Sequence, residues 1–311
     1  MESLQNHLKQ FMNSKGFRET YLNLKQQIKS DKDVRLFLEK HKNQIDEHMI
    51  DRSLGKLYEF VTQSKFCREC RNLDECKNIL KGYHPTLIIE RKTIDLKYDK
   101  CPRKEAYDAR KKQESLIKCM YVPKEILNAH LEDIDLNEPN RLKAVSLVQD
   151  FVEQYGQNDR LKGLYLYGSF GVGKTFILGA IANELAEKGV PSMLVYVPEF
   201  VRELKSALQD HSLNEKIDAV KKIPVLMLDD IGAESMSSWM RDDILGSILQ
   251  FRMLEKLPTF FTSNFNFSEL EHHLTYSQKG EIEQLKAKRI MERIRFLAIP
   301  VELKGKNRRQ E

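Results

Sequence analysis

The first 62 residues carry apolar side chains at helical spacing in a charged stretch that contains no proline. The apolar positions fall into two groups: Val34, Phe37 and Leu38, then Leu54, Leu57, Tyr58 and Val61. Residues three or four positions apart share one face of a helix. The pattern predicts two or three amphipathic helices that pack into a small local core.

From about Leu131 onward the pattern changes to apolar runs that alternate with helical stretches. A helix with an apolar stripe comes first, formed by Leu142, Val145, Val148, Phe151 and Val152. The short runs after it are continuously apolar, which is typical of strands buried on both faces. The alternation predicts an α/β fold, a parallel sheet with helices on both faces. The charged stretch before it predicts a linker, so we expect domains at 1–102 and 131–311 joined by a linker at 103–130.

Composition supports two folded domains and excludes a membrane protein. The chain has 311 residues, of which 41% are hydrophobic and 31% are charged, and its net charge is +5. No apolar run reaches the roughly 18 residues that span a bilayer, and the first twenty residues lack the apolar core of a signal peptide. We therefore expect a cytoplasmic protein that does not contact membranes.

A glycine-rich loop between a strand and a helix provides the clearest chemical signal. The stretch LYLYGSFGVGKT matches the G-x-x-x-x-G-K-[ST] pattern of a phosphate loop. Its eight residues are predicted to bind ATP: Gly168, Ser169, Phe170, Gly171, Val172, Gly173, Lys174 and Thr175. Glycines let the backbone curl around an anion, Lys174 reaches the β- and γ-phosphates, and the hydroxyl of Thr175 binds Mg²⁺.

Polar residues end two further predicted strands. Asp229 and Asp230 follow the apolar run VLML, and Asn264 ends the run LPTFFTSN. Carboxyl ends of parallel strands meet at one edge of the sheet, where ligands bind. Asp229 is predicted to hold Mg²⁺ together with Thr175, Asp230 to orient or deprotonate the attacking water, and Asn264 to contact the γ-phosphate or that water.

A helix near the C-terminus, AKRIMERIRF, places Arg289 and Arg293 four positions apart on one face. Paired arginines on a helix usually form a solvated surface. A more specific role is insertion of one arginine into the ATP site of a neighbouring subunit.

These four features in this order over 131–311 resemble the AAA+ ATPases. The stretches YGSFGVGKT, VLMLDDIGAE, PTFFTSN and KRIMERIR are similar to those of the helicase-loader branch, which also includes the transposition helper IstB. The resemblance implies ATP-dependent placement of the hexameric replicative helicase on single-stranded DNA, with other primosome proteins as further partners. It also implies that the N-terminal part grips the helicase, and that Arg293, with Arg289 second, acts in trans upon ATP-dependent self-association.

Because little chain follows the arginine helix, we expect the helical lid of most AAA+ proteins to be absent. That departure predicts ATPase activity that is weak or dependent on a partner. Two other functions stay open: an IstB-like transposition helper, and a zinc-stabilised DNA-binding regulator that uses ATP as a switch.

Clustered cysteines predict a zinc site in the N-terminal part. Cys67, Cys70, Cys76 and Cys101 offer four thiols, beginning with the C-x2-C spacing of structural zinc sites. Two short strands predicted around Arg91 and Lys92, within 87–98, would return Cys101 to the others. In an alternative set His84 replaces one of these cysteines, and Cys119, in the predicted linker, is assigned no metal role.

Basic residues that could contact DNA give only a weak signal. Lys222, Arg252 and the C-terminal stretch KGKNRRQE carry this charge. Lysine and arginine are common on the surface of any water-soluble protein.

Overall fold

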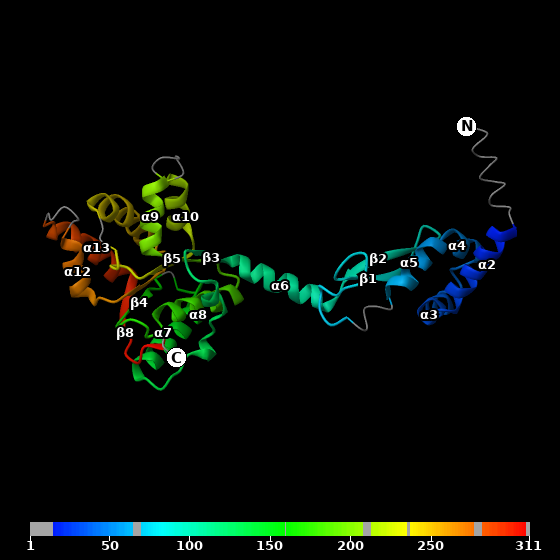
Figure 1. Ribbon diagram of the computed structural model, residues 1–311, viewed down its shortest axis with the longest axis horizontal. Coiled ribbons are helices and arrows are strands. Elements are labelled where there is room, and N and C mark those ends of the chain that lie inside the picture. The colour runs from blue at the N-terminus through cyan, green and yellow to red at the C-terminus, as the bar shows by residue number, and fades with distance from the viewer. Residues whose placement is uncertain are drawn as a thin grey trace. The chain divides into compact units, whose positions relative to one another are not determined.

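The computed structural model describes residues 15–64, 70–158, 160–207, 213–234, 237–276 and 282–308. The chain divides into two compact units, Met1–Arg110 and Lys111–Glu311 (Figure 1). In the described ranges no helix combines the length and the apolar character needed to cross a membrane.

The N-terminal unit packs short helices against a two-stranded hairpin. Its helices are α2 (Lys15–Ser30), α3 (Lys32–Lys40), α4 (Glu47–Arg52) and α5 (Leu54–Ser64). Asp31 caps α3 by accepting hydrogen bonds from the N–H groups of residues 33 and 34, and Asp46 caps α4 by accepting one from that of residue 49. The predicted amphipathic helices are confirmed: Val34 and Leu57 are fully buried, although Tyr58 is half exposed.

The hairpin joins β1 (Tyr83–Glu90) to β2 (Thr93–Lys100) in antiparallel register. Glu90 pairs with Thr93, so Arg91 and Lys92 form a two-residue turn, both with positive φ (45° and 61°). That geometry matches the twist of the flanking strands. Strands around Arg91 and Lys92 are thus confirmed, and the N–H of Ile94 ties them to the helices by a 2.8 Å bond to the buried Ser53 hydroxyl.

The structure differs from the linker prediction for 103–130. Most of the first half of this range belongs to a helix, α6 (Pro102–Leu116). None of its side chains is buried, and its sequence therefore lacks the apolar stripe from which an amphipathic helix is predicted. The strand β3 (Ile117–Met120) follows and pairs in parallel with β5 through main-chain bonds. Two 3₁₀ turns, η1 (Lys124–Asn128) and η2 (Leu131–Asp133), complete this stretch.

The C-terminal unit contains a six-stranded sheet in the order β3-β5-β6-β7-β4-β8, with every pairing parallel. Its other strands are β4 (Gly163–Tyr167), β5 (Ser192–Tyr196), β6 (Val225–Asp229), β7 (Thr259–Ser263) and β8 (Ala298–Glu302). Its helices are α7 (Pro139–Gln154), α8 (Lys174–Glu187), α9 (Val197–Ala207), α10 (Leu213–Lys222), η3 (Met240–Leu245, a π-helix), α11 (Gly246–Leu254), α12 (Phe267–Thr275) and α13 (Gln284–Leu297).

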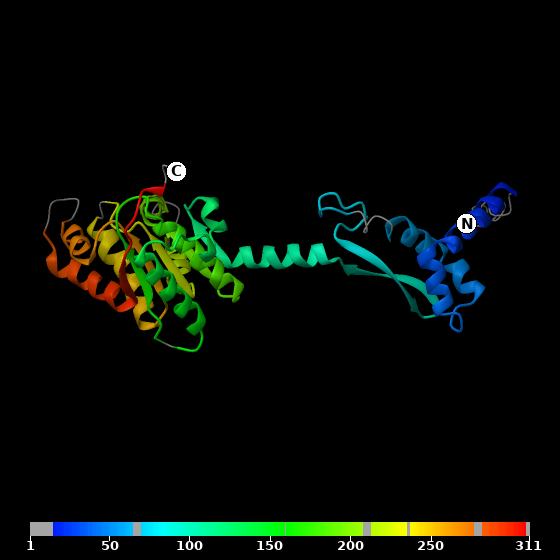
Figure 2. The same cartoon turned by 90° about the horizontal axis from the view of Figure 1, so that it is seen from below.

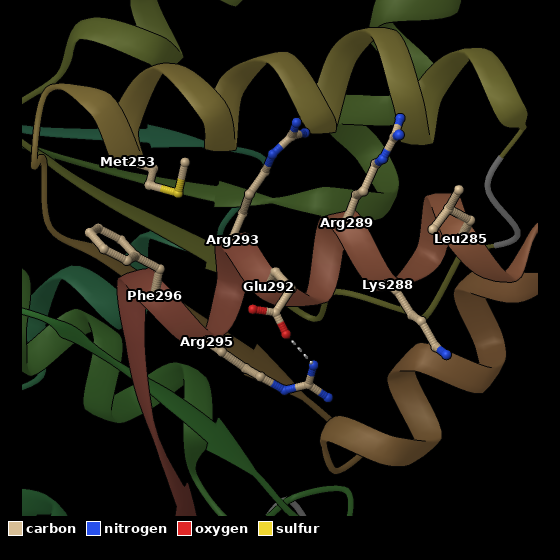
Figure 3. A pocket seen from close by; sticks show the side chains of 8 residues that line it. All are labelled: Met253, Leu285, Lys288, Arg289, Glu292, Arg293, Arg295 and Phe296. Atoms are coloured by element: carbon tan, nitrogen blue, oxygen red, sulfur yellow. Dashed lines mark hydrogen bonds and ion pairs between the residues drawn. The ribbon is translucent and has the colours of Figure 1, made fainter.

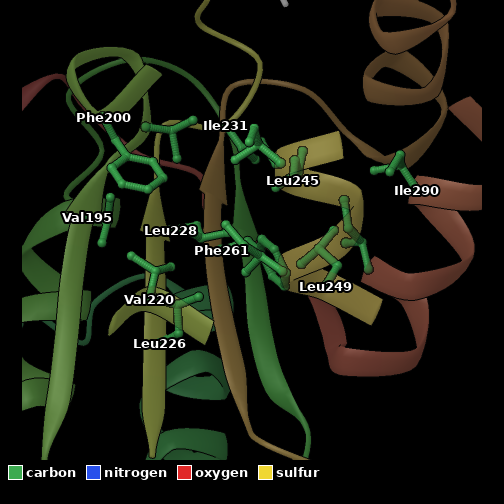
Figure 4. Close-up of a cluster of buried hydrophobic side chains, with 14 of the residues drawn as sticks. Val195, Phe200, Val220, Leu226, Leu228, Ile231, Leu245, Leu249, Phe261 and Ile290 are labelled. Atoms are coloured by element: carbon green, nitrogen blue, oxygen red, sulfur yellow. The ribbon is translucent and has the colours of Figure 1, made fainter. Parts of the chain in front are cut away.

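Helices cover both faces of this sheet, as predicted (Figure 2). Successive strand residues alternate between two cores. Leu226 and Leu228 join the core under α9 to α13, part of which Figure 4 shows. Val225 and Met227 join the core under α7 and α8. Because both faces are filled, the polar residues that end the strands collect at the carboxyl edge of the sheet.

Candidate functional site

The glycine-rich loop lies between the end of β4 and the first turn of α8. Gly168, Gly171 and Gly173 all have positive φ (147°, 76° and 91°), a region that residues with a Cβ rarely adopt. Phe170 points outward and is 66% exposed, whereas Val172 is buried and fixes the loop to the core. The sequence thus places a curled backbone at a helix N-terminus, which is an anion-binding arrangement.

Lys174 is drawn into this loop. Its Nζ donates hydrogen bonds to the carbonyl oxygens of Gly168 (2.8 Å) and Ser169 (2.9 Å) and to Oδ1 of Asn264 (2.8 Å). The side chain is only 8% exposed. The predicted pair Lys174 and Asn264, 90 residues apart in sequence, is therefore brought into direct contact.

Asp229 is buried beside the threonine of the loop. The hydroxyl of Thr175 contacts both its carboxylate oxygens, at 2.9 and 3.1 Å, and the hydroxyl of Thr262 donates to Oδ1 at 2.6 Å. Burial raises the pKa of Asp229, while the two hydroxyl donors partly offset this effect. Thr175 and Asp229 thus form an oxygen cluster of the kind that Mg²⁺ prefers.

Asp230 and Asn264 are also joined, as predicted for residues at neighbouring strand ends. Nδ2 of Asn264 donates to Oδ1 of Asp230 at 3.0 Å. Asp230 has a positive φ of 60°, and its N–H group donates to the hydroxyl of Thr262 at 2.8 Å. Asn264 therefore bridges the lysine of the loop and the second aspartate.

Two buried residues at the site were missed in the sequence. Thr262 precedes Asn264 by two positions on a strand end, so period-two alternation would have placed both on one face. Arg141, at the start of α7, is 3% exposed and donates from Nη2 to the carbonyl oxygen of Val172 in the loop. Nothing in its local sequence signals that contact.

The two arginines of α13 have different surroundings. Nη1 of Arg293 donates to the carbonyl oxygen of Gly246 at 2.9 Å, and burial lowers the pKa of this guanidinium. Arg289 is exposed, and it forms no hydrogen bond or ion pair with any residue of the described ranges. Both extend from the same side of α13, and Arg293 is the nearer of the two to Met253 and Phe296 (Figure 3).

Three of the four predicted zinc ligands line one cavity in the N-terminal unit. Cys70, Cys76 and Cys101 share it with His84. The N–H of Gly82 points to the sulfur of Cys76 (3.4 Å), and the Gly82 carbonyl accepts from the N–H of Cys101 (2.8 Å). Cys67 lies outside the described residues, and among those described no three acidic, histidine or cysteine side chains form a group that could hold a metal.

One predicted source of surface charge is wrong. Arg252 is completely buried, because its guanidinium is enclosed by oxygen acceptors from two segments of the chain. They are the carbonyl oxygens of Val220, Lys221, Ile223, Pro224 and Pro258 and the hydroxyl of Thr259. Lys222 is exposed and pairs with Asp218 at 2.7 Å.

Comparison with known proteins agrees with this geometry. The chain is 52% identical to the replicative helicase loader DnaI of Bacillus subtilis (strain 168), over 99% of each chain. The chain belongs to the DnaI family of replicative helicase loaders. Residues 1–98 match the family described as the primosomal protein DnaI N-terminus, and residues 102–311 match the IstB-like ATP binding proteins.

Two further similarities each cover part of the chain. A crystal structure of DnaI is 58% identical and superposes with a TM-score of 0.57, covering 63% of this chain and 99% of that one. The replicative helicase loader DnaC of Escherichia coli (strain K12) is 23% identical over 54% of this chain and 64% of its own. Membership of the DnaI family and the IstB-like match indicate an ATPase-type domain.

Proposed function

We propose that this protein is an ATP-dependent loader, which binds the hexameric replicative helicase and helps to place it on single-stranded DNA when replication starts or restarts. The observation that carries the proposal is the hydrogen-bonded set of Lys174, Thr175, Asp229, Asp230 and Asn264 in a chain that resembles DnaI from end to end. Such a protein would work in the cytoplasm.

The residues at the sheet edge fit ATP and Mg²⁺. The loop at 168–175 supplies main-chain N–H groups and Lys174 for the phosphates, while Thr175 and Asp229 would hold the metal. Bound Mg²⁺ neutralises charge on the phosphates. Asp230 is proposed to orient or deprotonate a water molecule, and Asn264 to sense the γ-phosphate. Asn264 donates a hydrogen bond to Asp230 and accepts one from Lys174, so the three side chains form one connected group.

Hydrolysis is proposed to be weak without a partner, because the charge that develops on the transferring phosphoryl group needs a further cation. The sequence favoured Arg293, with Arg289 second, as that cation in a neighbouring subunit. Their surroundings favour Arg289, since Arg293 is bonded to Gly246 of its own chain and Arg289 is exposed. This role requires ATP-dependent self-association.

Zinc is proposed to stabilise the N-terminal, helicase-binding module. The thiols of Cys70, Cys76 and Cys101 line one cavity, and Cys67, three positions before Cys70, is the fourth proposed ligand. In the alternative set, His84 replaces one of these cysteines. Thiolates in this number suit a closed tetrahedral site. A module with so small a core gains much of its folding free energy from such a metal.

Binding of single-stranded DNA and of other primosome proteins is proposed from the family alone. The exposed Lys222 and the C-terminal stretch KGKNRRQE are proposed to supply the electrostatic part of DNA binding. The buried Arg252 is not. DNA affinity should then fall steeply as salt rises.

The decisive experiment is co-purification of the full chain with the hexameric helicase of the same organism, with and without ATP. We expect a stable complex with the wild type, and helicase transfer to single-stranded DNA that is lost in Lys174→Ala. Sequence-specific binding to duplex DNA without any helicase complex would instead favour the regulator, and a complex with a transposase would favour the IstB-like helper.

A further inference from the structure

The C-terminal segment beyond β8 runs along the phosphate loop. The N–H of Leu303 donates to the carbonyl oxygen of Tyr167 at 2.7 Å, and that of Arg308 to the carbonyl oxygen of Gly171 at 2.9 Å. The guanidinium of Arg308 also pairs with Asp135, which precedes α7. The hydrogen bond from the N–H of Asn137 and, second, this ion pair lower the pKa of Asp135.

All three glycines of the loop lie close to this segment or to Arg141. A methyl group on Gly168 would overlap the carbonyl oxygen of Leu303, at 2.1 Å, and one on Gly171 would overlap Oδ1 of Asn307, at 1.8 Å. A methyl group on Gly173 would lie 3.6 Å from Nη2 of Arg141. The loop is therefore shaped by its protein neighbours on the side where these contacts are made, as well as by the demands of an anion.

Arg141, which is buried, contacts both the phosphate loop and the C-terminal segment. Its guanidinium lies beside both Gly173 and Gly305, and its buried Nε has no hydrogen-bond partner among the described residues. The charges of Arg308 and Asp135 both act on it. The C-terminal segment, the loop and the start of α7 thus form one packed unit that brings two cations next to a phosphate-binding backbone.

We propose that Asp135, Asn307 and Arg308 form a C-terminal clasp that holds the loop in its nucleotide-binding shape, with Arg308 as a positioning residue. A glycine-rich loop has many conformations, and a loop that must be ordered during binding lowers the affinity for its ligand. The clasp orders the loop beforehand. Its main-chain hydrogen bond goes to the carbonyl oxygen of Gly171.

The inference rests on the proposed binding of ATP at the loop. The test measures affinity and dissociation rate of a fluorescent ATP analogue with Mg²⁺, on the full-length protein and three variants. Arg308→Asp reverses the charge in the clasp. Lys306→Asp makes the same charge change two positions earlier, at an exposed side chain that bonds to none of the described residues. The double variant Asp135→Arg with Arg308→Asp restores the pair in reverse.

We expect Arg308→Asp to bind about fivefold to tenfold more weakly through faster dissociation, given the usual strength of an exposed ion pair plus the new repulsion from Asp135. Lys306→Asp should stay within about twofold of the wild type, since it alters only the long-range field. The double variant should recover most of the affinity. The hydrolysis rate of bound ATP and the melting temperature of the nucleotide-free protein should not change, which separates positioning from folding.

Equal affinities of Arg308→Asp and Lys306→Asp would overturn the clasp, as would a double variant as weak as Arg308→Asp. Tighter binding by Arg308→Asp would also overturn it, since the segment would then act as a barrier. Lys174→Ala distinguishes the two levels of the argument. If Lys174→Ala binds ATP normally, the proposed function fails. If Lys174→Ala does not bind ATP but Arg308→Asp binds it as tightly as Lys306→Asp does, only the clasp fails.

Discussion

Arg293 donates a 2.9 Å hydrogen bond to the carbonyl oxygen of Gly246, whereas Arg289, one turn earlier on α13, is exposed. An arginine that enters the ATP site of a neighbouring subunit must not be held by hydrogen bonds within its own subunit. We therefore expect Arg289→Ala to lower ATP hydrolysis by the assembled protein roughly tenfold or more, with ATP affinity unchanged. Arg293→Ala should mainly lower the free energy of unfolding, by about 1–3 kcal/mol.

Mixing variants tests this assignment in trans. A subunit with Lys174→Ala still offers Arg289, and a subunit with Arg289→Ala still offers an ATP site. An equimolar mixture should hydrolyse ATP faster than either variant alone. If the mixture is as inactive as its components, Arg289 does not act across subunits.

Asn264 connects Lys174 to Asp230, so its removal should affect chemistry more than binding. Asn264→Ala is expected to slow single-turnover hydrolysis about tenfold to a hundredfold. The affinity for ATP should change by no more than about threefold, because Lys174 keeps its own charge and only loses one hydrogen-bond acceptor. Asn266→Ala, the same substitution at the cap of α12, should cost about 1 kcal/mol of stability and leave hydrolysis intact. Equal hydrolysis rates in the two variants would contradict the sensor role.

The buried carboxyl group of Glu234 makes stability depend on pH. Burial raises its pKa from 4.5 to about 7. Its neutral form is favoured in the folded state, so its contribution to stability is complete below pH 4.5 and is lost as the pH rises through 7. Glu234→Gln should therefore be more stable than the wild type at pH 8, by at most about 3 kcal/mol, and equal to it at pH 4.5.

Urea unfolding followed through Trp239, the single tryptophan of the chain, reports on the unit that contains Glu234. A stability difference of the same size at both pH values would show that a packing change, and not ionisation, is responsible.

Loss of one thiol should release the proposed zinc. Cys76→Ser is expected to lower the metal content from about one zinc per chain to none and to make the N-terminal unit sensitive to protease, since such a site supplies on the order of 10 kcal/mol. ATP binding by the other unit should persist. Cys119→Ser is the matched control, because that thiol lies in β3, where burial raises its pKa to about 11. Wild-type protein without zinc and with a stable N-terminal unit would refute the proposal.

The sequence predicted those parts of the site that are marked by a short motif of neighbouring residues. The phosphate loop, the paired aspartates and Asn264 each follow an apolar strand, and strand ends of a parallel sheet must meet. The contact of Arg308 with Gly171 spans more than a hundred residues and depends on main-chain atoms, which every residue has. Charge alone misled the prediction for Arg252, because a sequence does not reveal where carbonyl oxygens gather in a folded interior.

The buried guanidinium of Arg252 joins the chain just before β6 to the chain at the start of β7, through Pro224, Pro258 and Thr259. The same two strands lead to Asp229 and Asn264 at their opposite ends. A movement of β6 relative to β7 that displaces Asp229 from Asn264 would break the hydrogen bonds of Arg252 at the other end of these strands. The relative position of Asp229 and Asn264 is thus also constrained at the far rim of the sheet, away from the phosphate loop.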